Sequence, residues 1–348
     1  MRFREHGFAP GILKPGRLNR ISDVAGVTVG HHTRMEGERV RTGVTVVDPG
    51  TPRLYHEKLP AAVAVGNGFG KLTGSTQVDE LGTLEAPIAL TSTLAVGQVL
   101  QGMVRLVLDN TPDIPADSTV NVLVGETNDG VLNDSHLTAI LPSDAGAAWQ
   151  ARSAGFAIGC VGAGTGTSAF SWKGGIGTAS RVVPVEGAKY TVGALLQTNF
   201  GGALTIMGVP VGTLLGKTNF DVQMAAADGS CMIVLATDAP LSARQLGRIA
   251  RRAMLGLART GSVLAHGSGD YAIAFSTSRA GVEGAACGGM GECLSDGRLN
   301  LFFLAAVEAV EESVYDALFA AETVVGRDGN RLERLPVEPV LEMLRKHG

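Results

Sequence analysis

Short, uninterrupted apolar runs constrain the fold of this chain more than any other sequence feature. The clearest run, residues 232–236, follows directly on the turn-forming tripeptide Asp228-Gly229-Ser230. An apolar run of this length beside turn residues is typical of a strand buried on both faces, whereas a strand with one solvated face alternates apolar and polar residues. The sequence therefore predicts strands and helices in mixed order, with sheets covered on both faces and strands paired antiparallel in part.

The other segments divide into predicted strands and helices. Strands are expected within residues 19–32 and at 43–47, 61–65, 120–124, 156–161, 190–197, 203–211, 232–237 and 271–277. Helices are expected at residues 93–109, 143–153, 242–257, 304–321 and 337–346, with Ser143 and Ser242 as N-caps. The polar, glycine-bearing segment 212–228 is predicted to be a flexible connection that leads into the turn at Asp228-Gly229-Ser230. Glycine supplies 48 of 348 residues, about twice its usual share, which indicates many tight turns and close backbone approaches.

The composition argues against several functional classes. The formal net charge is -4 and no basic stripe is present, so nucleic acid is not an expected partner. The N-terminus lacks the apolar core of a signal peptide, and no stretch offers about 18 uninterrupted apolar residues, which predicts a cytoplasmic protein without a membrane partner. The four cysteines form no CxxC pair, so we expect free thiols and no metal or cofactor.

Three conspicuous motifs give only weak signals. His31 and His32 are adjacent, and on a strand they would point to opposite faces, which argues against a shared metal ion. Residues 66–71 (GNGFGK) suggest a phosphate-binding loop, but the P-loop spacing and its Ser or Thr are missing. The glycines within residues 162–177 lack the strand-to-helix context of a dinucleotide-binding fingerprint.

Ser230 is the candidate nucleophile, because at the leading edge of a buried strand it can be both rigid and reachable. Gly229 permits backbone conformations in which the Ser230 hydroxyl approaches the carbonyl group just before it. Cleavage between these two residues would create an α-amine with a reference pKa of about 7.7 to 8.0, which can act as a general base. The alternative is that Asp-Gly-Ser before a strand is only a turn, and the tripeptide alone does not decide.

Two further polar clusters accompany the ends of predicted strands. Residues 125–134 (GETNDGVLND) concentrate potentially ligating side chains after the strand at 120–124, a pattern that fits function and turn chemistry equally well. Residues 267–270 (GSGD) place a second serine and a carboxylate at the leading edge of the strand at 271–277.

Six motifs, in their order along the chain, resemble the L-aminopeptidase D-esterase/amidase family, which includes the β-peptidyl aminopeptidases. They are residues 66–72 (GNGFGKL), 125–130 (GETNDG), the glycine series at 162–177, 198–201 (TNFG), 228–230 (DGS) and 267–270 (GSGD). The resemblance covers nearly the whole chain. It implies a single α+β domain, a four-layer αββα sandwich like that of the N-terminal-nucleophile hydrolases. It also implies self-cleavage into an alpha chain, 1–229, and a beta chain, 230–348, and assembly of these heterodimers into a homo-oligomer.

The resemblance also implies catalytic roles for individual residues. Ser230 matches the nucleophile that is freed by cleavage. Ser268 and Asp270 match a second serine and an acid that orient or relay the proton leaving Ser230, although Asp270 is one methylene shorter than the glutamate of some members. Asn199 matches an asparagine whose side-chain amide contributes to the oxyanion hole.

The residues expected to bind the substrate depart from the family pattern at one position. Glu126 resembles the carboxylate that binds the free amino group of the substrate, which distinguishes an aminopeptidase from an endopeptidase. Family members can use a tyrosine near this segment, but the chain has no tyrosine between Tyr55 and Tyr190. Asn128 is the candidate replacement.

These residues point to a self-processing serine aminopeptidase or amidase that releases N-terminal residues from small peptides, amides or esters through an acyl-enzyme. Two alternatives remain open. An acyltransferase of the ornithine acetyltransferase type is similar in fold and self-cleavage, but it uses threonine as nucleophile, and the serine at position 230 argues against it. An uncut, inactive relative would instead be a small-molecule binding protein.

Overall fold

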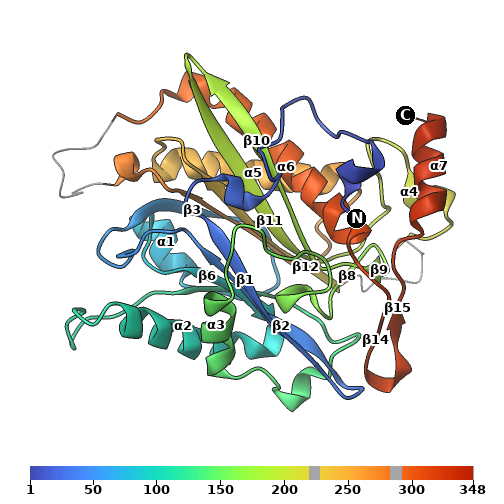
Figure 1. Cartoon of the computed structure of the whole chain (residues 1–348), viewed down its shortest axis with the longest axis horizontal. Helices are drawn as coiled ribbons and strands as arrows, with labels where there is room; N and C mark the ends of the chain where they lie inside the picture. Colours follow the sequence, from blue (N-terminus) through green and yellow to red (C-terminus); the bar gives the residue numbers. More distant parts are fainter. Residues whose placement is uncertain (219–227, 283–291, 348) are drawn as a thin grey trace.

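Two β-sheets stack face to face, and helices cover both outer faces (Figure 1). The computed structural model describes residues 1–218, 228–282 and 292–347. The six-stranded sheet has the order β10-β11-β12-β13-β3-β5, and the five-stranded sheet has the order β1-β2-β6-β7-β4. The neighbours β12 and β13 are parallel, as are β6 and β7, whereas the other neighbouring pairs in these two sheets are antiparallel.

The bounds of the elements are as follows. The six-stranded sheet contains β10 (Ile176–Val185), β11 (Ala188–Asn199), β12 (Asp228–Thr237), β13 (Gly267–Ser276), β3 (Leu59–Gly68) and β5 (Thr83–Leu84). The five-stranded sheet contains β1 (Thr28–Glu36), β2 (Val40–Asp48), β6 (Ile88–Ser92), β7 (Leu123–Thr127) and β4 (Leu72–Thr73). Two small hairpins are β8 (Ser168–Ala169) with β9 (Trp172–Lys173), and β14 (Val324–Val325) with β15 (Arg331–Leu332). The helices are α1 (Ser75–Leu81), α2 (Val96–Asn110), α3 (Pro142–Gln150), α4 (Val211–Leu214), α5 (Ala243–Arg259), α6 (Asn300–Phe319) and α7 (Val337–His347).

Three apolar clusters lie between the four layers. α5 and α6 pack on the six-stranded sheet around residues such as Ile233 and Val310. α2 and α3 pack on the five-stranded sheet around residues such as Met103. The two sheets face each other across a cluster that includes Met232 and Val234. The predicted α+β class and αββα layer order are therefore confirmed.

Alternation along β12 decides where the serine at its beginning points. Ile233 contributes to the cluster under α5 and α6, whereas Met232 and Val234 contribute to the cluster between the sheets. Successive side chains of a strand point to opposite faces, so Ser230 shares the face of Met232 and Val234. Its side chain is therefore directed toward the gap between the two sheets.

Most helices and strands lie where the sequence predicts them. The N-cap predicted at Ser143 is wrong, because α3 begins at Pro142 with Leu141 as its N-cap and ends at Gln150. The helix expected at 93–109 is α2, which a 3₁₀ turn at Thr93–Ala95 precedes. Ser242 caps α5 as expected, because its hydroxyl accepts a hydrogen bond from the Gln245 amide and its own amide donates to the Gln245 side chain. The strand expected at 120–124 begins and ends three residues later, as β7. Among the described residues, no helix combines the length and apolar character that a membrane crossing requires.

Three strand predictions are wrong in whole or in part. Residues 19–27 contain a 3₁₀ turn at Ile21–Asp23, because the Asp23 carboxylate accepts hydrogen bonds from the backbone of Leu18 and Arg20. Residues 156–161 form only an isolated bridge at Gly159, whose φ of 85° is not extended. Residues 203–211 turn back tightly at Met207 and Gly208, so Leu204, Ile206 and Val209 are buried although they lie on a loop and not on a strand. Of the predicted connection at 212–228, residues 219–227 lie outside the described residues.

α6 carries four buried acidic side chains, which are Glu308, Glu311, Glu312 and Asp316. Arg181 of β10 is 0% exposed and pairs with Glu308 at 2.9 Å and with Glu312 at 2.7 Å. Arg2 and Arg4, near the N-terminus, also pair with this helix. Because buried charges need partners, these ion pairs tie the N-terminal segment and β10 to a helix that lies far along the chain.

We expect Arg181→Met to lower the free energy of unfolding by about 3 to 5 kcal/mol, because the change leaves the Glu308 carboxylate buried without its cation, whereas Glu312 keeps its ion pair with Arg4. Chemical denaturation at a fixed protein concentration measures this. Arg298→Met is the matched control: Arg298 pairs with Glu186 on the surface, and its loss should cost less than about 1 kcal/mol. Equal effects of the two substitutions would contradict the account.

Candidate active site

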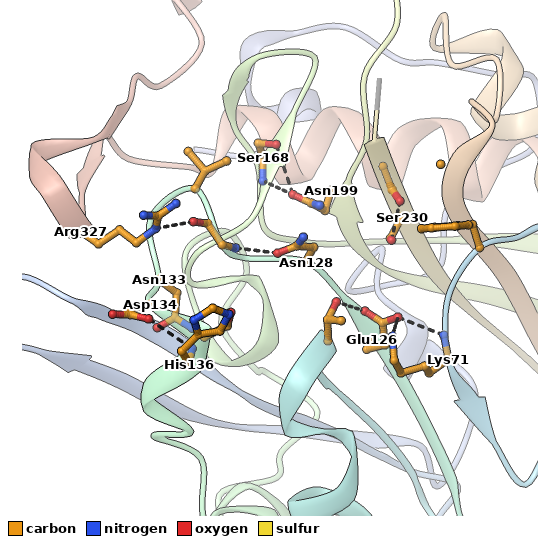
Figure 2. Close-up of a pocket in the computed structure, with 17 residues that line it drawn as sticks. Lys71, Glu126, Asn128, Asn133, Asp134, His136, Ser168, Asn199, Ser230 and Arg327 are labelled. Atoms are coloured by element: carbon orange, nitrogen blue, oxygen red, sulfur yellow. Dashed lines mark hydrogen bonds and ion pairs between the residues drawn. The ribbon is translucent and has the colours of Figure 1, made fainter. Parts of the chain in front are cut away.

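A cavity of about 590 Å³ lies where β12 begins and where β7 and β11 end. Its walls include Glu126, Asn128, Asn199, Gly229 and Ser230, five of the residues predicted from the sequence (Figure 2). The other two, Ser268 and Asp270, are buried behind this wall and do not line the cavity. The structure therefore brings most of the predicted site together around one space, from segments far apart in the sequence.

Ser230 lies against the peptide bond that precedes it. Its side chain is directed into the cavity, and its hydroxyl donates a hydrogen bond to the Gly229 carbonyl oxygen at 2.5 Å. The residue is only 4% exposed and lies within the ladder of β12. The hydroxyl is thus both rigid and close to the carbonyl group before it.

Gly229 has extended backbone and is not among the residues with positive φ. Its lack of a side chain matters because of space: a Cβ on Gly229 would lie 3.0 Å from the Ser268 hydroxyl oxygen. Gly229 therefore does not adopt a backbone conformation that only glycine favours. Instead, glycine lets the second serine approach the backbone of the Gly229-Ser230 peptide.

Ser268 and Asp270 lie on the opposite face of the sheet from the Ser230 side chain. In the parallel pair of β12 and β13, Ser268 is the partner of Gly229, and Gly269 is the partner of Ser230. Paired residues point to the same face and successive residues to opposite faces, so both polar side chains face away from the Ser230 hydroxyl. They are close to the backbone of the Gly229-Ser230 peptide rather than to the hydroxyl.

Both of these buried side chains lack hydrogen-bond partners among the described residues. This holds for the Ser268 hydroxyl and for both carboxylate oxygens of Asp270. Burial raises the pKa of Asp270 to about 6, while the nearby Ser268 hydroxyl lowers it without meeting the geometry of a hydrogen bond. Unpaired buried polar groups are rare, and they mark a place where another donor or acceptor is missing.

The hairpin of β8 and β9 fixes the orientation of the Asn199 side chain. Asn199 is the last residue of β11 and the antiparallel partner of Ser230. Its Oδ1 accepts hydrogen bonds from the Ser168 amide at 3.1 Å and from the Ser168 hydroxyl at 3.2 Å (Figure 2). Since a backbone amide can only donate, Oδ1 must be the atom that faces Ser168. Nδ2 of Asn199, which has no partner among the described residues, is left as a donor at the cavity wall.

Glu126 presents a buried carboxylate to the cavity, with a residue exposure of 2%. One oxygen accepts from the Lys71 amide at 3.0 Å, and the other accepts from the Thr93 hydroxyl (Figure 2). The Lys71 ammonium is 3.8 Å away and half exposed. The last residue of the glycine-rich loop at 66–71 therefore contacts a carboxylate of the protein. Two neutral donors and a distant cation leave this carboxylate able to bind a further ammonium group.

Known proteins share this architecture over the full chain. The model of Peptidase family S58 matches residues 19–332. The β-peptidyl aminopeptidase BapA of Sphingosinicella microcystinivorans is 39% identical, over 96% of this chain and 89% of its own. The chain belongs to peptidase family S58. It is therefore a hydrolase, a serine aminopeptidase, and the acyltransferase and binding-protein alternatives are set aside.

Solved structures agree with this membership. The PH0078 protein of Pyrococcus horikoshii OT3 is 43% identical and superposes with a TM-score of 0.93, over 100% of both chains. The L-aminopeptidase D-Ala-esterase/amidase of Ochrobactrum anthropi is 35% identical with a TM-score of 0.90, over 100% of this chain and 99% of its own. That enzyme is described as a prototype for the serine aminopeptidases and a new variant among the Ntn hydrolase fold. The fold of this S58 chain is such a variant.

Asn128, the candidate replacement for a tyrosine, lines the cavity but is engaged locally. Its Oδ1 accepts from the Gly130 amide at 2.8 Å in a tight turn. A phenol does approach the site from another strand: Tyr271 of β13 donates to the Gly70 carbonyl oxygen at 3.0 Å. A Cβ on Gly70 would lie 3.2 Å from the Tyr271 ring and 3.3 Å from the Glu126 carboxylate. A phenol close to the Glu126 wall therefore comes from β13 and not from the segment after β7.

Several residues of this wall carry no signal in the sequence. Ser168 and Thr93 hold site side chains, but each is an ordinary hydroxyl residue in its own segment. Arg327, at the tip of the β14–β15 hairpin, reaches the wall and donates to the Gly130 carbonyl oxygen at 2.6 Å. Only folding brings these segments together, so a search for motifs misses them.

The adjacent histidines lie away from the cavity and face opposite ways, as predicted. The His31 ring contacts Thr45 and the Ala157 carbonyl, and burial lowers its pKa to about 4. The His32 ring lies 3.4 Å from the Asp144 carboxylate. Among the described residues, no three His, Cys, Asp or Glu side chains gather as metal ligands would.

Asp129, which follows Asn128, gives a pH-dependent prediction. It is 2% exposed, and burial raises its pKa to about 6 from an ordinary value of 3.8. The folded state therefore binds its proton more tightly than the unfolded state, so stability is lost as the pH rises from about 4 through 6. We expect Asp129→Asn to raise the free energy of unfolding at pH 8 by up to about 3 kcal/mol relative to its effect at pH 4.

Denaturant unfolding of the wild type and Asp129→Asn at both pH values tests this expectation. A difference between the two proteins that is the same at pH 4 and pH 8 would contradict it.

Proposed function

We propose that the chain cuts itself between Gly229 and Ser230 and that residues 1–229 and 230–348 together form the active aminopeptidase. The observation that carries this proposal is the Ser230 hydroxyl hydrogen-bonded to the carbonyl oxygen of Gly229, at the wall of the cavity. Addition of Oγ to the Gly229 carbonyl carbon and breakage of the C–N bond, with a proton passing to nitrogen, gives an ester. Water then splits the ester into the Gly229 carboxylate and a Ser230 with free amine and hydroxyl.

The freed amine of Ser230 is the general base for its own hydroxyl. Its reference pKa of about 7.7 to 8.0 keeps a useful fraction neutral near pH 7. The amine takes the Oγ proton as Oγ attacks the substrate carbonyl carbon, and it returns a proton to the leaving amine. An acyl-enzyme forms and is hydrolysed by water activated in the same way.

Ser268 and Asp270 act on this amine and not on the hydroxyl. Their place behind the Gly229-Ser230 peptide supports this assignment, as do their unpartnered oxygens. A hydroxyl and a carboxylate beside the new amine accept its hydrogen bonds and keep its lone pair directed toward Oγ. Asp270 reaches less far than a glutamate. It is the register partner of Cys231, whereas Ser268 is the partner of Gly229, so the two side chains flank the Gly229-Ser230 peptide along the strand.

Asn199 donates to the oxyanion that develops on the substrate. Its Nδ2 is the unused donor nearest in the ladder to Ser230, whose partner it is. A donor directed at charge that appears only in the transition state is typically worth about 3 to 4 kcal/mol.

Glu126 binds the free amino group of the substrate, so the enzyme releases N-terminal residues from small peptides, amides or esters. Its burial supports this role, because a buried carboxylate discriminates strongly for an ammonium partner. Asn128 contributes to the same wall. We further propose that the cut chains assemble into a homo-oligomer and act in the cytoplasm.

The cleavage has a direct test. Intact-mass measurement of the purified wild type should give two chains, of residues 1–229 and 230–348. Ser230→Ala should give only the uncut mass and no turnover, because the variant has no hydroxyl to add to the carbonyl. Cut chains in Ser230→Ala would remove Ser230 from the self-cleavage step.

The substrate role of Glu126 has a separate test. We expect Glu126→Gln to cut normally but to lose roughly 30-fold or more in kcat/KM for an amino-acid p-nitroanilide with a free amine. The residual rate on the N-acetylated analogue should not change, because that substrate brings no ammonium. Asp109→Asn, which alters an exposed carboxylate paired with Arg105 on α2, is the control and should leave both rates unchanged. Equal losses on both substrates would assign Glu126 to the chemical step.

A further inference from the structure

We propose that Lys173 and Ser168 are positioning residues that hold the Asn199 amide with Nδ2 directed into the cavity. This inference rests on the proposed role of Asn199 as oxyanion donor. Neither residue is catalytic, since neither is assigned a contact with the reacting atoms. They act through the hairpin of β8 and β9, which lies within the glycine series at 162–177 and contacts β11.

The first link is the contact between the hairpin and Asn199. Ser168 begins β8 and directs two donors, its amide and its hydroxyl, at Asn199 Oδ1. Asn199 is the last residue of its strand, so neighbouring strands alone do not determine the rotation of its side-chain amide. If the amide turned over, an oxygen would face the developing oxyanion and repel it. The position of Ser168 thus decides which end of the amide faces the cavity.

The second link is the ammonium group of Lys173, the residue paired with Ser168 in the hairpin. The side chain is 0% exposed, and Nζ donates to three backbone carbonyls, of Gly164 at 2.9 Å, Thr167 at 2.8 Å and Gly174 at 2.8 Å. These carbonyls lie on both arms of the hairpin, before Ser168 and after Lys173. All three N–H groups are used, so the ammonium cross-links the two arms beneath Ser168.

The third link joins the hairpin to β11. The Gly175 amide donates to the Thr198 hydroxyl at 2.9 Å, and the Thr198 amide donates to the Gly175 carbonyl at 3.1 Å. Thr198 immediately precedes Asn199. The hairpin is therefore fixed to the strand end beside the amide it orients, and a shift of either arm moves Ser168 relative to Asn199.

Burying the Lys173 ammonium costs free energy, which indicates that its hydrogen bonds have a structural role. Among the described residues, the Lys173 ammonium forms no ion pair with a carboxylate, and its direct partners are backbone carbonyls. Burial lowers its pKa to about 8, while Cys160 and the charge of Asp129 raise it. A buried charge without a carboxylate in direct contact is unfavourable compared with an apolar side chain of the same length. What the charge provides is three strong hydrogen bonds from one atom, which makes the glycine-rich arms rigid where their glycines would leave them free.

A double-mutant cycle on fully cut enzyme tests the inference. The single variants are Ser168→Ala, Lys173→Met and Asn199→Ala, and the measurements are kcat and KM on one p-nitroanilide, corrected by intact mass for uncut chain. We expect kcat to fall roughly 3- to 10-fold in Ser168→Ala and roughly 30- to 100-fold in Lys173→Met, with KM within about twofold of the wild type. In the Asn199→Ala background, the same two changes should each cost less than about threefold.

Lys217→Met is the matched control. The Lys217 ammonium lies over the ring of Trp172 in the same hairpin, at 4.7 Å from its centroid, but it makes no hydrogen bond to the arms among the described residues. The same chemical change there should leave kcat unchanged. If Lys173→Met does not fold, Ser168→Ala carries the cycle, because it removes a single hydroxyl.

Two results would overturn the inference, and they differ in meaning. If losses in Ser168→Ala and Lys173→Met are the same with and without the Asn199 amide, the hairpin does not act through Asn199, although Asn199 can still be the oxyanion donor. If Asn199→Ala itself leaves kcat unchanged, the oxyanion assignment fails and the positioning role fails with it.

Discussion

The pairing of β12 with β11 on one side and β13 on the other determines the rest of the site. The antiparallel register places Asn199 beside Ser230, and the parallel register places Ser268 beside Gly229. Strand alternation then sends the Ser230 hydroxyl into the cavity and leaves Ser268 and Asp270 behind the backbone. In the proposed mechanism, the substrate and the oxyanion therefore meet the front of the Gly229-Ser230 peptide, and the groups proposed to bind the new amine lie at its back.

The same pairing explains how a cut chain would stay together. Residues 1–229 contribute β11 and β3, and residues 230–348 contribute β13 and nearly all of β12, so strands of the first piece flank those of the second on both sides within one sheet. The buried ion pairs of Arg2, Arg4 and Arg181 with α6 also join the two pieces. A break at Gly229-Ser230 removes one covalent bond and none of these contacts. The new amine would appear within a rigid sheet, opposite groups that lack partners in the uncut chain.

Local signals in the sequence predict the elements well, and long-range packing decides what they miss. The apolar run of β12 and the cap at Ser242 depend on neighbouring residues and lie where expected. The direction of the Ser268 and Asp270 side chains depends on the register between β12 and β13. Ser230 and Ser268 are 38 residues apart in the sequence, and no local pattern encodes such a register. The buried acids of α6 were equally hidden, because charged residues in a helix usually face solvent and these meet arginines from distant segments. Ser168 lies in a glycine-rich segment, and its sequence context does not indicate the contact with Asn199 that the folded hairpin creates.

The central claim is that the enzyme becomes active when cleavage releases the α-amine of Ser230, which then acts as the general base. Its most direct test follows freshly produced uncut chain over time, with intact mass giving the fraction cut and hydrolysis of a free-amine p-nitroanilide giving the activity of the same samples. We predict that activity starts near zero and rises in proportion to the cut fraction. Full activity while the chain is still uncut would contradict the account, because the Ser230 nitrogen would then be an amide without a basic lone pair.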